Sequence, residues 1–182
     1  KVELETKNDS LIIKCENYRT IFKGLSADDF PTIPKIDGDV FCSMANNVFR
    51  KSLNQVVNIS SFSESRPEIS GILFKFENKN LKLVATDGFR LAEINVYKLN
   101  NKNEKSIIIP QRTGQELIRI LSQKEGDLKI IINQNQILFD IDNIQLISRL
   151  VDGQYPNYEQ LIPKELKIQI VLNREEFLNI VK

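Results

Sequence analysis

The chain has 182 residues, a length that suits one domain, or one domain together with parts of its neighbours. Hydrophobic residues make up 41% of the chain and charged residues 27%, which is typical of a folded globular protein and argues against disorder. The 25 Lys and Arg residues almost balance the 24 Asp and Glu residues. The net charge therefore neither favours nor excludes a nucleic-acid or membrane partner, and any electrostatic argument has to be local.

The absence of histidine narrows the possible chemistry. The chain has 0 His, and His is both the side chain that titrates near neutral pH and the commonest ligand of transition metals. This argues against Ser-His-Asp triads, metal hydrolases and histidine acid–base sites. The sequence also contains no phosphate-binding glycine loop, nucleophile elbow or metal-ligand cluster. We therefore expect no catalytic residues, no bound metal and no cofactor.

Cysteine usage and hydropathy indicate the compartment. Cys15 and Cys42 match no metal-binding or redox motif, so we expect two reduced, buried side chains, with a disulfide as the alternative. No run approaches the ~20 apolar residues that a membrane-spanning helix needs. No charged and apolar leader opens the chain. These features predict a cytoplasmic protein with no membrane partner.

The first part of the chain is predicted to form strands. Alternating or β-branched runs occur at 1–6, 10–15 and 18–23. Residues 24–37 follow and are rich in Gly, Asp and Pro, which is typical of a linker, so we expect a domain boundary there. The chain begins inside a strand pattern and ends inside a helical one. We therefore expect it to be a piece of a longer protein.

One order of elements is predicted twice after this linker. The first copy has a strand at 39–43, a helix at 44–58 with Ser43 as its N-cap, and strands at 70–77, 81–86 and 89–97. The second copy has a strand at 106–109, a helix at 110–122, and strands at 127–132, 136–140 and 144–150. Asp87-Gly88 indicates a hairpin, because Gly adopts positive φ without steric cost. A strand, a helix and three strands, duplicated, predict an α+β fold.

Further repeats indicate a tandem of like domains. A third copy is predicted to start with a strand at 167–172 and a helix that Asn173 caps, with Glu176 three residues later. The segment 21–31 also parallels 147–156, with a period of about 125 residues. We expect one complete domain in this chain, together with the last strands of a preceding copy and the first strand and helix of a following one.

Both predicted helices carry polar faces. The face on the first helix has no acidic residue and consists of Asn47, Arg50, Lys51, Asn54 and Asn58. The face on the second helix consists of Arg112, Gln115, Glu116, Arg119 and Gln123. Such side chains can bind the phosphates of a nucleic acid without reading its sequence. An ordinary solvated helix face is the alternative, and composition alone favours it.

A few other residues have two interpretations. Asp87 is either a turn residue, which we favour, or an isolated catalytic carboxylate. One set of apolar residues at strand ends either fills the core or lines a groove, and consists of Ile69, Leu91, Tyr155 and Leu161. A second set lies on the third strand and would form an exposed edge prone to self-association, and consists of Tyr18, Thr20 and Phe22.

Several segments, in order along essentially the whole chain, resemble the bacterial sliding clamps, the β subunits of DNA polymerase III. The matching segments are Gly71-Ile72-Leu73-Phe74, Val84-Ala85-Thr86-Asp87-Gly88-Phe89-Arg90-Leu91-Ala92, Ile108-Ile109-Pro110, Leu150-Val151-Asp152-Gly153-Gln154-Tyr155-Pro156-Asn157-Tyr158 and Leu161-Ile162-Pro163. The resemblance implies the DNA-clamp fold, in which antiparallel sheets lie outside and two helices per domain line the inner face. It also implies the end of clamp domain 1 at 1–33, all of domain 2 at 36–162 and the start of domain 3 at 164–182.

The same resemblance implies a function without catalysis. Clamp subunits form a head-to-tail ring of two around double-stranded DNA and tether the polymerase, which makes replication processive. The implied partners are DNA, the DNA polymerase III alpha subunit, the clamp loader, repair proteins with clamp-binding motifs, and a second copy of the full-length subunit. The alternatives from the residues alone are a structural tandem-domain protein without DNA binding, or a carboxylate- and metal-dependent enzyme.

The resemblance also assigns residues to sites. The DNA contacts it implies are Arg50, Lys51, Arg66, Gln111 and Arg112. The second-domain wall of a peptide-binding pocket would consist of Ile69, Thr86, Gly88, Phe89, Arg90, Leu91, Pro156, Gln160 and Leu161. Phe89 stands where His is frequent in the family and Gln160 where Arg is frequent, so the motif preference is open. The subunit interface would include Tyr18, Thr20 and Phe22.

Overall fold

The computed structural model describes residues 1–30, 36, 38–61, 65–97, 99, 101, 103–163, 165 and 167–181. The chain divides into two compact units, Lys1–Asp37 and Gly38–Lys182. The predicted linker lies largely at the end of the first unit, and its residues 31–35 and 37 are outside the described part.

The first unit contains a three-stranded antiparallel sheet in the order β1-β2-β3. Its strands are β1 (Val2–Lys7), β2 (Ser10–Cys15) and β3 (Tyr18–Lys23), as the alternating pattern predicts. A single turn of 3₁₀ helix, η1 (Ala27–Asp29), follows. Asn8 and Asp9 connect β1 to β2 with positive φ angles of 48° and 55°, which is the backbone of a type I′ hairpin.

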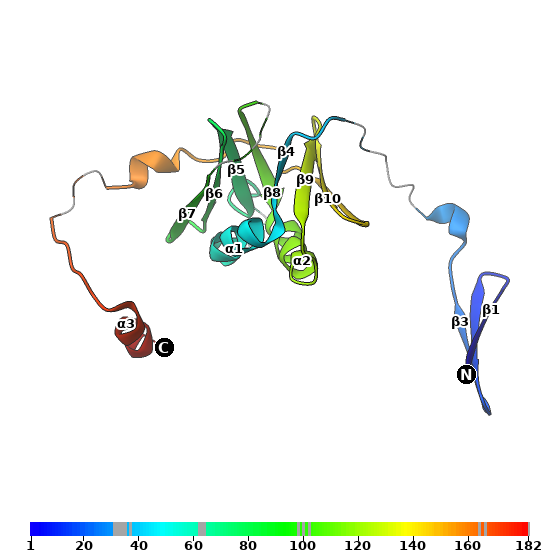
Figure 1. The fold of residues 1–182 in the computed structure, drawn as a ribbon. Coiled ribbons are helices and arrows are strands. Elements are labelled where there is room, and N and C mark those ends of the chain that lie inside the picture. The colour runs from blue at the N-terminus through cyan, green and yellow to red at the C-terminus, as the bar shows by residue number, and fades with distance from the viewer. Residues whose placement is uncertain are drawn as a thin grey trace. The chain divides into compact units, whose positions relative to one another are not determined.

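The second unit contains two four-stranded antiparallel sheets (Figure 1). One sheet has the order β7-β6-β5-β8 and is built from β5 (Gly71–Glu77), β6 (Asn80–Thr86), β7 (Leu91–Val96) and β8 (Lys105–Pro110). The other has the order β11-β10-β9-β4 and is built from β4 (Cys42–Ala45), β9 (Asp127–Ile132), β10 (Gln136–Ile141) and β11 (Ile144–Arg149). The predicted duplication is confirmed as β4-α1-β5-β6-β7 followed by β8-α2-β9-β10-β11.

Helices α1 (Asn46–Val56) and α2 (Gln111–Leu121) lie side by side against the same side of the two sheets (Figure 1). The 3₁₀ turn η2 (Val57–Ile59) continues α1. Gly114 on α2 marks the close approach of the helices, because a Cβ there would lie 2.8 Å from Ile72 Cδ1 and 3.3 Å from Val57 Cγ2. The side-chain amide of Gln111 also joins the helices by donating to the carbonyl of Val57 at 2.9 Å.

The core of the second unit fills the space between the helices and the sheets. Phe49 of α1, Phe74 of β5 and Phe139 of β10 are fully buried and meet at ring-centroid distances of 5.8 to 6.5 Å. Cys42 is buried in the same cluster, and Cys42 and Cys15 are both free thiols. Of the two cysteines predicted to be buried, Cys42 is buried and Cys15 is only half-buried.

Three predicted boundaries are wrong. The first strand of the unit is Cys42–Ala45 rather than 39–43, because Cys42 to Ala45 pair with β9 and carry the strand past Ser43. The N-cap of α1 is Ala45, not Ser43, and it makes no side-chain capping bond. The strand predicted at 89–97 begins only at Leu91, because the residues before it form a turn.

The C-terminal residues show one confirmed element and one correction. Asn173 caps α3 (Arg174–Ile180), and its side chain accepts hydrogen bonds from the backbone N–H groups of Glu175 and Glu176. The strand predicted at 167–172 does not form. Its apolar side chains are exposed, and no described strand pairs with it. A 3₁₀ turn, η3 (Tyr158–Leu161), precedes this region.

Candidate functional site

The exposed faces of α1 and α2 carry most of the predicted DNA contacts. Lys51 and Arg112 are exposed and Arg50 is half-buried. None of the three forms an ion pair with a residue in the described part of the chain. On α2, by contrast, Arg119 is paired with Glu116 at 2.8 Å. The first helix contains no acidic residue, so its basic groups remain available to an anionic partner.

The two other residues predicted to contact DNA have different surroundings. Arg66 is exposed and lies before β5, in the connection that follows η2. Gln111 is only 6% exposed, and its side-chain nitrogen bonds the carbonyl of Val57. This amide holds α2 to the end of α1, so Gln111 is less accessible to a phosphate than the other residues predicted to contact DNA. The family resemblance assigned Gln111 and its exposed neighbour Arg112 to DNA contact alike, because it carries no information on burial.

The turn between β6 and β7 carries several of the residues predicted for the peptide pocket. Thr86 Oγ1 donates to the carbonyl of Arg90 at 2.7 Å and accepts from the N–H of Gly88 at 3.1 Å. Gly88 has a φ of 90°, which other residues adopt only with strain. These bonds close the turn and leave Phe89 at its tip, where its side chain is 98% exposed.

Both carboxylate oxygens of Asp87 make bonds within the same turn. Its Oδ1 accepts hydrogen bonds from the N–H groups of Phe89 and Arg90, and its Oδ2 pairs with the Arg90 guanidinium at 2.9 Å. The N–H groups of Arg90 and Phe89, followed by the Arg90 side chain, lower the pKa of Asp87 to about 2. A carboxylate that is held ionised in this way is a poor general acid or base near neutral pH, and the structure places Asp87 in the favoured turn role.

The other predicted pocket residues differ in burial. Ile69 is 4% exposed and Leu91 is half-buried, so both have a core role as well. Pro156, Gln160 and Leu161 lie on or beside η3 and are exposed, Leu161 by 75%. The apolar residues at the strand ends were expected either to fill the core or to line a groove, and they divide between the two. Ile69 is a core residue, whereas Leu161 is exposed and open to contact.

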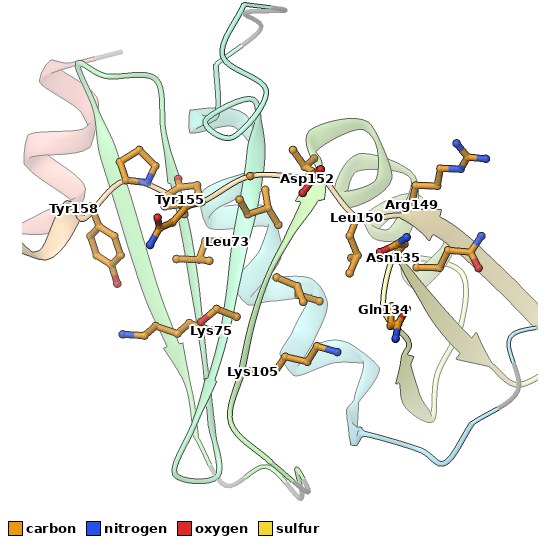
Figure 2. A pocket seen from close by; sticks show the side chains of 18 of the residues that line it. Leu73, Lys75, Lys105, Gln134, Asn135, Arg149, Leu150, Asp152, Tyr155 and Tyr158 are labelled. Carbon is orange, nitrogen blue, oxygen red and sulfur yellow. The ribbon is translucent and has the colours of Figure 1, made fainter.

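A separate groove of about 1240 Å³ lies beside this region and was not predicted (Figure 2). Figure 2 shows Leu73, Lys75 and Lys105 on one side of it and Gln134, Asn135 and Arg149 on the other. Of the residues predicted for the peptide pocket, all of which the structure describes, only Pro156 lines this groove. The groove forms where β8 and the β9–β10 turn come together, a contact between the two sheets that no local sequence signal indicates.

The predicted interface residues lie on an edge strand. β3 pairs with β2 alone among the described strands, and Tyr18 and Phe22 are 79% and 55% exposed. The register places Tyr18, Thr20 and Phe22 on the same face as Val2, Leu4 and Ile13. One face of this sheet is therefore largely apolar and exposed within the unit.

Metal-binding clusters and membrane-spanning helices are both absent from the described residues. These residues contain no group of three His, Cys, Asp or Glu side chains placed to hold a metal ion. Within the same ranges, every helix is too short or too polar to cross a bilayer.

Comparison with known proteins places the chain in a family. Residues 43–157 match the family described as "DNA polymerase III beta subunit, central domain". The chain is 34% identical to the beta sliding clamp of Bacillus subtilis, over 99% of this chain and 48% of that protein. It is 31% identical to the beta sliding clamp of Staphylococcus aureus, over 87% of this chain and 42% of that protein.

Solved structures give the same result. The fold superimposes on the DNA polymerase sliding clamp of Bacillus subtilis with a TM-score of 0.88 at 33% identity, covering 98% of this chain and 47% of that one. It superimposes on the DNA polymerase III beta chain of Streptococcus pneumoniae with a TM-score of 0.80 at 27% identity, covering 90% and 44%. The chain thus spans about half the length of these relatives. It belongs to the family of DNA polymerase III beta subunits, the sliding clamps, and contains the central domain of that family.

Proposed function

We propose that this chain is the middle part of a sliding-clamp subunit that encloses duplex DNA and tethers a DNA polymerase without catalysing a reaction itself. Its divisions would be the end of the first clamp domain at 1–33, the second domain at 36–162 and the start of the third at 164–182. The observation that carries the proposal is the pair of adjacent helices whose basic side chains Arg50, Lys51 and Arg112 have no ion-pair partner among the described residues, in a chain of this family. Such a clamp would act in the cytoplasm.

The helix face supports a sliding mode of DNA binding. Arg50, Lys51 and Arg112 can each contact a phosphate, and phosphate contacts carry no sequence information. In a closed ring the topological link to DNA provides retention, so each contact can be weak enough to permit movement. Arg66, which is exposed beside β5, would add a further contact.

Neutralising this face tests the proposal. In the full-length subunit, R50Q/K51Q/R112Q should weaken DNA binding and lower the slope of log affinity against log salt by about 3, which is about 1 for each basic side chain removed from a phosphate. Clamp loading on circular DNA and processivity should fall with it. The matched control is K7Q/K79Q/K129Q, which removes the same charge from exposed positions outside the helices. Equal salt slopes in the two triple variants would favour the structural tandem-domain alternative.

We further propose that the surface around the β6–β7 turn and η3 captures a short peptide motif of the DNA polymerase III alpha subunit, the clamp loader and repair proteins. Its members would be Ile69, Thr86, Gly88, Phe89, Arg90, Leu91, Pro156, Gln160 and Leu161. The exposed apolar side chains of Phe89 and Leu161 support this, because apolar anchors often dominate such interfaces.

The pocket in the family also has a wall from the third domain, so this chain alone should bind such a peptide poorly. Titrating a labelled alpha-subunit peptide against the chain and against the full-length subunit measures the difference. We expect clearly weaker binding by the chain. Equal affinities would show that the third-domain wall contributes nothing and would contradict this part of the proposal.

The β3 edge is proposed as part of the contact between two full-length subunits. Tyr18, Thr20 and Phe22 present an apolar row beside a strand edge that no other described strand pairs with, and a strand from a partner could extend the sheet there. Gel filtration of the full-length subunit should show a dimer, and T20R/F22E should convert it to a monomer. A dimer that survives this double substitution would place the interface elsewhere.

A further inference from the structure

The segment 151–161 crosses the face of the β7-β6-β5-β8 sheet that is turned away from α1 and α2, which we call the outer face. Strand register places Ile108, Leu73, Val84 and Glu93 in one row across this face. Tyr158 packs on the apolar part of that row and is 4% exposed. Its hydroxyl donates to Glu93 Oε2 at 2.7 Å, so the same ring is held by packing and by a charge-assisted hydrogen bond.

Glu159, the residue after Tyr158 in the segment, contacts the next row of side chains on the outer face. Lys75 and Lys82 are partners across β5 and β6. Glu159 Oε1 lies 3.2 Å from Lys75 Nζ and 3.5 Å from Lys82 Nζ, so one carboxylate bridges both strands. Figure 2 shows Lys75 and Tyr158 on this outer face of the sheet. We call Lys75, Lys82, Glu93, Tyr158 and Glu159 the clasp.

The clasp adjoins the proposed peptide pocket. Thr86 and Leu91 are partners in the row beyond Val84 and Glu93, and they lie on the same outer face because side chains two residues apart on a strand share a face. On the segment, Pro156 precedes Tyr158 by two residues and Leu161 follows Glu159 by two. Contacts that fix Tyr158 and Glu159 therefore also fix the distance between the two sides of the pocket.

Packing of the exposed pocket residues does not hold this end of the segment. Gln160 is exposed and Leu161 is 75% exposed, so neither side chain is anchored by burial. The side chains of Lys75 and Lys82 are 27% and 22% exposed and that of Glu159 is 51% exposed, so solvent screens these ion pairs in part and the buried Tyr158 provides the firmer anchor. The pKa of Glu159 is lowered, chiefly by its hydrogen bond with Lys75, which keeps the carboxylate charged.

We propose that the residues of the clasp are positioning residues for peptide capture: without touching the peptide, they hold Pro156 and Leu161 in register with Thr86 and Leu91. This inference rests on the proposed function. It predicts that loosening the clasp lowers peptide affinity while the fold and the face of α1 and α2 are unaffected.

A charge swap provides the test. Glu159→Lys places a third cation against Lys75 and Lys82, and we expect about fivefold weaker binding of a labelled alpha-subunit peptide to the full-length subunit. In the wild type Lys75 also pairs with Glu77 at 2.8 Å. Adding Lys75→Glu restores the net charge of the cluster and gives the introduced lysine acidic partners at position 75 and at Glu77, so affinity should return to within about twofold of the wild type. The control, Glu125→Lys, makes the same charge change at an exposed position outside the clasp and should leave affinity unchanged.

A second measurement does not depend on the peptide. Backbone amide hydrogen exchange at residues 156–161 should be faster in Glu159→Lys than in the wild type and should recover in the swapped double variant. Tyr158→Phe keeps the ring over Leu73 and Val84 but removes the bond to Glu93, and it should also increase exchange there. Thermal unfolding midpoints that stay close to the wild type show that the variants are folded.

The outcomes separate the two proposals. A wild-type full-length subunit that does not bind the peptide contradicts the proposed pocket. Unchanged exchange in Glu159→Lys and Tyr158→Phe contradicts the clasp. If the wild type binds and exchange increases but affinity does not fall, the clasp holds the segment without positioning the pocket, and the inference is overturned.

Discussion

Asp87 shows how one side chain can define a turn. It accepts two backbone N–H groups and pairs with Arg90, so the chain reverses between β6 and β7 on the bonds of this one carboxylate and of Thr86. Gly88 supplies the positive φ that the reversal needs. Phe89 is therefore exposed at the tip of a turn that several hydrogen bonds close, a position open to contact with a partner. The Asp-Gly pair predicted the turn, but the strand pattern wrongly included Phe89 in β7.

A pH titration measures how strongly the folded turn holds Asp87. Its folded-state pKa of about 2 is below the ~3.9 of an unfolded Asp. A lowered pKa means that the ionised carboxylate stabilises the fold above pH ~4, and that this stabilisation is lost as the pH falls toward 2. NMR titration of the Asp87 carboxyl group should give a midpoint near 2. A midpoint near 4 would show that the turn does not favour the charged form.

Gln111, unlike Asp87, makes its main side-chain bond to a residue far away in the chain. It follows Pro110 at the start of α2, where a polar side chain is expected to face solvent, yet its amide bonds the carbonyl of Val57 inside the structure. That carbonyl belongs to a segment 54 residues earlier, so no local pattern indicates the bond. The neighbouring Arg112 is exposed, so its guanidinium is accessible to an anionic partner.

At the scale of elements, the close approach of the two helical segments depends on a glycine, which has no side chain. Gly114 allows α2 to approach Val57 and Leu53 of the first helical segment and Ile72 of β5. Gly is unfavourable inside a helix by about 1 kcal/mol relative to Ala, so its presence here reflects packing rather than propensity. The basic side chains of both helices depend on this approach for their mutual position.

Gly114→Ala tests that packing. The gain in helix propensity of about 1 kcal/mol is opposed by an overpacking cost of about 1 to 3 kcal/mol, because Ile72 is fully buried and cannot move away freely. We expect a net decrease of about 1 kcal/mol in the free energy of unfolding, measured by urea denaturation. Gln115→Ala, at an exposed position of the same helix, is the control and should be close to neutral. A more stable Gly114→Ala variant would mean that the helices have room between them.

At the scale of the whole molecule, the two repeats of the second unit exchange strands. β4 precedes α1 and belongs to the first repeat, but it pairs with β9 of the second. β8 opens the second repeat and pairs with β5 of the first. Each sheet is therefore completed by the other repeat, and neither repeat has its full sheet alone. This exchange makes the unit a single cooperative body rather than two.

Deleting the first unit tests the independence of the second. The aromatic core and both four-stranded sheets lie within Gly38–Lys182, whereas buried apolar residues in the first unit are confined to Ile12 and Ile36 in the described part. A chain of residues 38–182 should therefore unfold in one transition with the same midpoint as residues 1–182. Circular dichroism during heating measures this. Disappearance of the cooperative transition would show that residues 1–37 support the second unit.

The duplicated order of elements, the hairpin at Asp87-Gly88 and the cap at Asn173 were determined by the sequence alone, because each depends on periodicity or on the backbone preference of one residue. The family was also indicated by motifs within single segments. Tertiary structure alone decided the pairing of β4 with β9, the burial of Gln111, and the clasp of Tyr158 and Glu159 on the outer face. Those contacts join residues far apart in the chain, and their energies depend on which surfaces meet, which local sequence does not specify.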